Sequence, residues 1–139
     1  MILPIVAYGH PVLRLKCIDI DSSYKDLDKL INDMWDTMYS SDGVGLAAPQ
    51  IGKSLRLFIV DANPLSDSEE FDEKLKMAMI NPKVIKSSES LSSFNEGCLS
   101  IPDVRGEVLR PETIEIEYYD ENFNLKKSMF DGIISRVIQ

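Results

Sequence analysis

The clearest periodic pattern in the chain lies between residues 22 and 39. Apolar side chains recur there at three- and four-residue steps: Leu27, Leu30, Ile31, Met34, Trp35 and Met38. This spacing predicts a long amphipathic helix whose apolar face packs in the core. Ser22 and Ser23 are candidate N-caps, and the turn-forming residues 40–43 predict the end of the helix near Tyr39.

Four further segments have patterns typical of β-strands: 55–60, 77–85, 112–118 and 123–130. The first two are mainly apolar, which indicates burial, although Asn81-Pro82 predicts a turn or edge position inside the second. The third alternates apolar residues with glutamates, as in a half-buried antiparallel strand, and the fourth is its expected hairpin partner. An apolar helix is expected from Gly132. This order predicts an α+β fold of mixed or antiparallel sheets around the long helix.

Two uncharged, glycine-containing blocks interrupt these elements. Residues 43–50 read Gly-Val-Gly-Leu-Ala-Ala-Pro-Gln, and residues 97–102 read Gly-Cys-Leu-Ser-Ile-Pro after Glu96. One block ends in an amide and the other carries a thiol, so together they suggest a site that admits the backbone of a ligand. Alternatively, the first is a tight turn and Cys98 fills the core, as free cysteines usually do.

Composition narrows the classes of function. A length of 139 residues predicts one domain, and the net charge of −8 excludes nucleic acid as a direct partner. No apolar run is long enough to cross a membrane, and the first six residues lack the basic start of a signal peptide. Two cysteines form no disulfide framework. We therefore expect a cytoplasmic protein. The single histidine, His10, precedes Pro11 and is expected in a turn.

The two blocks resemble the first two signature motifs of peptide deformylases, and Gly9, Pro11, Leu13 and Arg14 are similar to that family's N-terminus. The resemblance implies a metallo-hydrolase that removes the N-formyl group from the initiator methionine of new polypeptides. It also implies a divalent metal (iron, zinc or nickel) held by one cysteine and two histidines, with an open position for water. Formylmethionyl peptides and possibly the ribosome are the implied partners.

The resemblance assigns a role to each candidate site residue. Cys98 matches the metal ligand, and Gln50 with the backbone N–H of Leu99 matches the pair that faces the formyl oxygen. The other matches are Gly43, Gly45 and Gly97 where the substrate backbone approaches, Arg105 near the site, and Val44, Ile133 and Val137 around the methionine side chain. Glu96 either pairs with Arg105 or faces solvent.

The family's third motif, His-Glu-x-x-His, does not occur in these 139 residues. We therefore expect a single domain over 1–139 that is C-terminally incomplete, with its last helix cut short. We also expect the metal to be absent or weakly bound and the chain as written to be inactive. An exposed apolar patch around Ile133 and Val137 would then favour a marginal monomer or an assembly.

Two other classes of function stay open at this point. A non-catalytic peptide-binding module could pair an extended peptide with 114–116 or with the Gly43 block. A cysteine hydrolase could use Cys98 as nucleophile, but it needs a nearby base, and His10 is the only imidazole.

Overall fold

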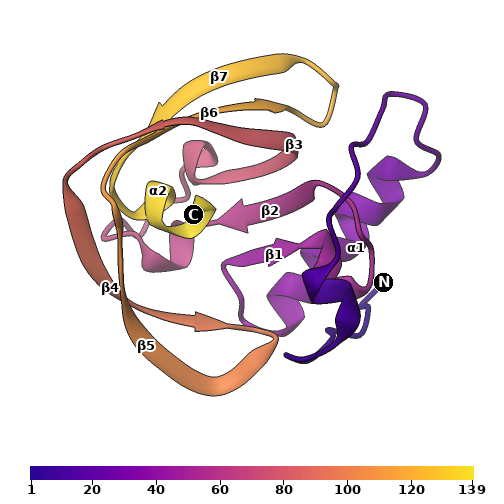
Figure 1. The fold of residues 1–139 in the computed structure, drawn as a ribbon, viewed down its shortest axis with the longest axis horizontal. Coiled ribbons are helices and arrows are strands. Elements are labelled where there is room, and N and C mark those ends of the chain that lie inside the picture. The colour runs from indigo at the N-terminus through magenta and orange to yellow at the C-terminus, as the bar shows by residue number, and fades with distance from the viewer.

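The computed structural model describes residues 1–139. It contains the helices α1 (Leu27–Ser40) and α2 (Gly132–Ile138) and the strands β1 (Gly45–Ala47), β2 (Leu57–Asp61), β3 (Lys76–Ser87), β4 (Leu91–Cys98), β5 (Ile101–Pro111), β6 (Ile114–Tyr119) and β7 (Leu125–Phe130). Five strands form one antiparallel sheet in the order β1-β2-β3-β6-β7, and β4 and β5 form a separate two-stranded sheet (Figure 1). The predicted α+β class with antiparallel sheets is confirmed.

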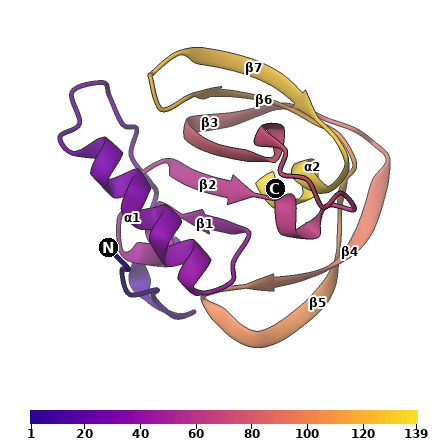
Figure 2. The ribbon, with the colours of Figure 1, turned by 180° about the vertical axis from the view of Figure 1, so that it is seen from behind.

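The two helices cover opposite faces of the five-stranded sheet, as Figures 1 and 2 show from opposite sides. Successive side chains of a strand point to opposite faces. Ile59 of β2 therefore packs in the cluster that contains Met34 and Met38 of α1, whereas its neighbour Val60 packs in the cluster that contains Ile134 of α2. Burial on both faces explains why the first four residues of β2, 57–60, are all apolar.

The long helix begins later than its apolar pattern suggested. Helix α1 begins at Leu27, and its N-cap Asp26 has left-handed backbone angles and makes no capping bond through its side chain. Ser23 instead donates to Asp21 in the preceding turn. The predicted start at Ser22 and Ser23 is therefore wrong, because the hydrogen bonds of Ser23 stabilise a turn before the helix.

Strand β3 continues through Asn81 and Pro82, where the sequence predicted a turn or edge position. The register against β6 shifts in this stretch, and Asn81 has φ of 51°. Its side-chain amide accepts from the N–H of Ile20 at 2.8 Å and donates to the C=O of Ile20 at 2.7 Å. The irregularity is thus a bulge that fastens the N-terminal segment to the sheet.

The β4–β5 hairpin is the element that sequence patterns did not reveal. Residues 87–93 are mostly serine and show no apolar alternation, yet β4 begins at Leu91 and pairs with β5 up to Cys98. The register shifts between Gly97, which pairs with Arg105, and Cys98, which pairs with Ile101 across the turn. Neither helix of the chain has the length and apolar character needed to cross a membrane.

Candidate functional site

The two glycine-containing blocks meet in space, as the sequence suggested. Gln50 lies in a 3₁₀ turn (Ala48–Ile51) after β1, and its Nε2 lies 3.6 Å from Sγ of Cys98 at the end of β4. The same Nε2 donates to Oγ of Ser100 at 3.2 Å, while Oε1 accepts from the N–H of Ala47 at 2.9 Å. Because its oxygen is held by Ala47, the amide presents its N–H groups to the cysteine.

The N-terminal segment connects both blocks through its backbone. The N–H of Val6 donates to the C=O of Gln50, and the N–H of Tyr8 donates to the C=O of Ser100, each at 2.8 Å. Val6 and Tyr8 lie two residues apart, so their bonds hold the amide block beside the tip of the hairpin. The N-terminal segment, which lies outside every helix and strand expected from the sequence, is therefore part of what positions the site.

Glycine at position 43 allows the hairpin tip to approach the end of α1. A Cβ at this position would lie 2.7 Å from Cδ1 of Leu99 and 3.3 Å from Cγ of Met38, closer than carbon atoms normally approach. At position 45 a Cβ would lie 3.6 Å from Cγ1 of Val137, an ordinary contact. Leu99 at the hairpin tip thus lies beside Gly43, and Val137 of α2 lies beside Gly45 of β1.

Strand β1 forms one edge of the five-stranded sheet. It pairs with β2 on one side only, and the C=O of Val44, just before it, accepts from the N–H of Asp61 at 2.8 Å. The outer edge of β1 therefore offers backbone groups to which an extended ligand could add as a further strand.

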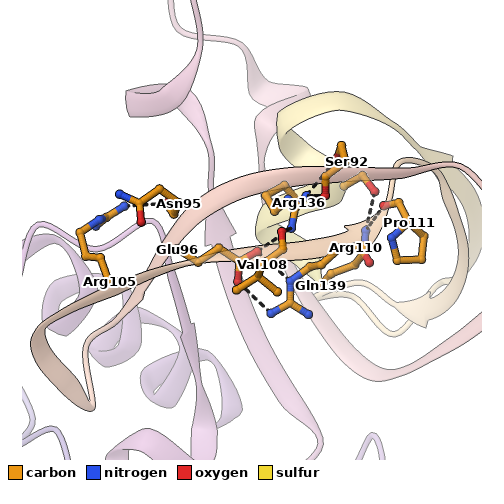
Figure 3. Close-up of polar contacts among 10 residues, drawn as sticks. Ser92, Asn95, Glu96, Arg105, Val108, Arg110, Pro111, Arg136 and Gln139 are labelled. Atoms are coloured by element: carbon orange, nitrogen blue, oxygen red, sulfur yellow. Dashed lines mark hydrogen bonds and ion pairs between the residues drawn. The ribbon is translucent and has the colours of Figure 1, made fainter.

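Glu96 does not pair with Arg105 and is not a solvent-facing charge, which corrects both sequence-based alternatives. Its carboxylate accepts from Nε and Nη2 of Arg110, at 2.7 and 2.8 Å, and from Nη1 of Arg136 at 2.8 Å (Figure 3). The hydrogen bonds from Arg110, with those from Arg136, hold the pKa of Glu96 below its usual value against the effect of burial. The carboxylate is therefore the centre of an ion-pair network.

Arg105 lies in another part of the hairpin. Its Nη2 donates to the C=O of Asn95 at 2.8 Å, away from the Glu96 carboxylate (Figure 3). It pairs in register with Gly97, and a Cβ at that position would lie 3.0 Å from Nη1 of Arg105. Arg105 and Gly97 are thus neighbours, and their roles toward a substrate stay predictions.

Sequence reasoning missed Arg110 and Arg136. The side chain of Arg136 is 7% exposed, in a short helix whose other buried residues include Ile134 and Ile138. A buried arginine requires an acceptor, and Glu96 beside the cysteine is a carboxylate in an otherwise uncharged motif. That combination was the available signal.

Of the three residues expected around a methionine side chain, Ile133 lines a described cavity. Ile133 lines a cavity of about 400 Å³ together with Phe94 and Arg136, whereas Val44 and Val137 are not among its lining residues. Ile133 and Val137 are both partly buried against the second core cluster. Their role in a side-chain pocket stays a prediction.

The residues of this chain do not by themselves fit a metal centre of one cysteine and two histidines. Cys98 is exposed and free, but no group of three or more histidine, cysteine, aspartate or glutamate side chains converges. Nδ1 of His10 accepts from the N–H of Val12 at 3.1 Å at the start of a 3₁₀ turn, as expected of a turn residue. The hydrogen-bond partner of Cys98 is Gln50, so no general base supports a cysteine hydrolase.

Comparison with known proteins agrees with the geometry. The family model described as polypeptide deformylase matches residues 2–139. The peptide deformylase of Flavobacterium psychrophilum is 53% identical over 146 residues, which cover all of this chain and 75% of that protein, and the one from Christiangramia forsetii is 50% identical with 74% of its length covered.

Solved structures show the same fold. A class I type b peptide deformylase from Acinetobacter baumannii superimposes with a TM-score of 0.90 at 30% identity, covering all of this chain and 90% of that one. Peptide deformylase from Thermotoga maritima gives 0.87 at 32% identity, covering 100% and 88%. The fold and the meeting of the two motifs define a hydrolase scaffold. This chain belongs to the peptide deformylase family.

Proposed function

We propose that this chain forms the substrate-binding and thiolate part of a site that hydrolyses the N-formyl group of formylmethionyl peptides. In that reaction water adds to the formyl carbon, the C–N bond breaks, and formate and a free amine leave. The observation that carries the proposal is the 3.6 Å approach of Gln50 Nε2 to Cys98 Sγ from two motifs 48 residues apart.

Gln50 is proposed to orient the formyl group and stabilise its oxygen. Its amide is held by Ala47 and Ser100, so its N–H donors are fixed before a ligand arrives. The backbone N–H of Leu99 is the proposed second donor. Donors aimed at an oxygen that gains negative charge contribute about 3 kcal/mol each to lowering a barrier.

The peptide part of the substrate is proposed to lie along the outer edge of β1. Gly43 lets Leu99 at the hairpin tip lie close to that edge. A peptide strand added to β1 would therefore run past Leu99 and Cys98. Val44, Ile133, Val137, Gly97 and Arg105 are the proposed surroundings of its side chains.

A metal centre of the family type needs ligands that these 139 residues do not contain. Cys98 would be the one thiolate ligand, and a metal bound there would supply an activated water. Because a lone thiolate binds a divalent metal weakly, we expect the 139 residues alone to release formate at no more than background.

The test compares this chain with the same chain lengthened by the segment that follows the matched region in the Flavobacterium psychrophilum relative. Both are loaded with Fe²⁺ or Ni²⁺ without oxygen, and formate release from a formyl-Met-Ala-Ser peptide is measured. We expect release only by the lengthened chain, reduced about a hundredfold by Gln50→Ala. A lengthened, metal-loaded chain that releases no formate contradicts the proposal.

A peptide-binding module is the second candidate, favoured by the unpaired edge of β1. Titration calorimetry of the 139-residue chain with formyl-Met-Ala-Ser decides whether the chain binds the peptide without catalysis. No heat at millimolar peptide contradicts this second candidate. Assembly through an apolar patch and contact with the ribosome stay predictions. Sedimentation that shows a stable monomer at all concentrations would contradict the first.

A further inference from the structure

An ion-pair network around Glu96 joins the β4–β5 hairpin to the helix α2. Arg136 of α2 donates to Oε2 of Glu96, the C=O of Val108 at 3.1 Å, and the C=O and Oγ of Ser92 at 2.6 and 3.0 Å. These acceptors lie on both strands of the hairpin, so one side chain from a different element holds β4 and β5 together (Figure 3).

The geometry of this arginine suits a positional role. Its guanidinium carries several donors in a rigid plane, and four contacts with three residues fix that plane in one orientation. The side chain is buried, so its ion pair with Glu96 is weakly screened. Gln139, one turn further on, adds a bond from Nε2 to the C=O of Pro111 at 2.8 Å.

The position of the hairpin determines the position of the thiol. Glu96 lies two residues before Cys98 on β4, and the hairpin belongs to a sheet separate from the one that carries β1. Its side-chain bonds to the rest of the molecule fall at the tip, through Gln50, and along its length, through Arg136 and Gln139. Without the bonds from Arg136 and Gln139, the remaining hydrogen bonds between the hairpin and other elements are those at its tip, from Gln50 and Tyr8.

We propose that Arg136 is a positioning residue, which sets the β4–β5 hairpin so that Cys98 and Leu99 face Gln50 and Gly43. Its value for catalysis rests on the proposed function, whereas its effect on geometry does not. Arg136 links the helix α2 to the hairpin that carries the proposed metal ligand, so movement of one is transmitted to the other.

The test is Arg136→Met in the 139-residue chain, examined by NMR without any formyl peptide. Methionine keeps much of the apolar stem, and Glu96 retains Arg110 as a partner, so the variant leaves no unpaired carboxylate. We expect loss of the nuclear Overhauser contact between the Leu99 methyl groups and Gly43, and at least tenfold faster exchange of the Tyr8 amide proton, which is bonded to Ser100. Contacts between Ile59 and Met34 should persist.

The matched control is Arg56→Met. Arg56 also donates to a carboxylate, Asp19, and to a main-chain carbonyl, that of Pro82, but it joins the N-terminal segment to β3. Arg56→Met should leave the Leu99–Gly43 contact unchanged. Arg136→Lys should retain part of the contact that Arg136→Met loses. If Arg136→Met keeps this contact and the Tyr8 protection, or loses the Ile59–Met34 contact as well, the positioning role is wrong. Neither result depends on whether the lengthened chain releases formate.

Discussion

The five-stranded sheet and the β4–β5 hairpin are stabilised in different ways. In the sheet, Ile59, Met79 and Ile80 are fully buried between the two helices. In the hairpin, the large apolar residues Val104 and Leu109 are about two-thirds exposed, at 61% and 66%. The sheet is therefore a packed apolar layer, whereas the hairpin depends on hydrogen bonds and ion pairs.

The candidate site lies where these two regions meet. Gln50 and Gly45 belong to the well-packed region, while Cys98 and Leu99 belong to the polar-linked hairpin. The comparison teaches that global stability and site geometry are separable in this molecule. Substitutions in the apolar layer should unfold the chain, and substitutions in the network should displace the thiol.

The largest effect is expected from Ile59→Ala. It removes a fully buried side chain between β2 and α1, which costs about 3 kcal/mol in unfolding free energy. Leu109→Ala, the matched change in the hairpin, should cost under about 0.5 kcal/mol because that side chain is exposed. Urea denaturation followed by circular dichroism measures both, and similar costs would remove the distinction between the regions.

Glu96→Gln is expected to cost about 2 kcal/mol, because two guanidinium groups lose their anionic partner. The loss should be concentrated in faster hydrogen exchange of β4 and β5. Glu115→Gln is the control: its carboxylate is equally buried but lies 3.5 Å from a single, largely exposed cation, Lys127, and such a pair contributes under about 1 kcal/mol. Equal effects, or faster exchange spread evenly over β2 and β3, would contradict this prediction.

Tyr39→Phe should cost about 1 kcal/mol at pH 7, since it removes the 2.6 Å bond from the Tyr39 hydroxyl to Asp61 between α1 and β2. Burial alone would raise the pKa of Asp61, but hydrogen bonds from Tyr39 and Asn63 lower it below its ordinary value of 3.8.

The pH dependence follows from that lowered pKa. A carboxylate with a lowered folded pKa stabilises the protein above pH 3.8, and this contribution disappears as the pH falls through the folded value. The difference between wild type and Tyr39→Phe should therefore shrink on acidification from pH 6 to pH 2. Urea midpoints across this range measure it, and a difference that grows on acidification would show that the sign is wrong.

Arg105→Met is expected to have the smallest effect, within about 0.5 kcal/mol. The side chain is exposed, and its bond to the C=O of Asn95 stays inside the hairpin. Thermal unfolding measures it, with Arg110→Met as the comparison that should cost more because Arg110 contacts Glu96 twice. A loss above 1 kcal/mol for Arg105→Met would indicate that the exposed end of the hairpin is also fastened to the rest.

Elements whose apolar residues recur with a regular period could be predicted from the sequence. The apolar steps of α1 and the alternation of β6 follow from burial on one side, and both elements occur where predicted, apart from their ends. The helix start could not be predicted because Asp26 adopts left-handed angles that no capping pattern signals. The hairpin was missed because small polar residues of β4, such as Ser92 and Ser93, have no period.

The candidate site was predictable only as far as its motifs reach. Gln50 and Cys98 belong to recognisable blocks, so their meeting could be expected. The partners of Glu96 are 14 and 40 residues away in the sequence, and a carboxylate with several arginines in the chain does not reveal which of them folding brings close. Such pairings are fixed by tertiary packing, so the sequence signals that the Glu96 carboxylate needs a cation but not which arginine supplies it.

The sheet has two outer margins, and they differ in what they allow. The β7 margin carries the adjacent cations Lys126 and Lys127, which discourage a second chain from joining there. The β1 margin is uncharged but only three residues long, from Gly45 to Ala47. If a peptide adds to the sheet as proposed, charge disfavours the β7 margin and length limits the β1 margin. Such a site would take short chain ends in preference to long extended segments.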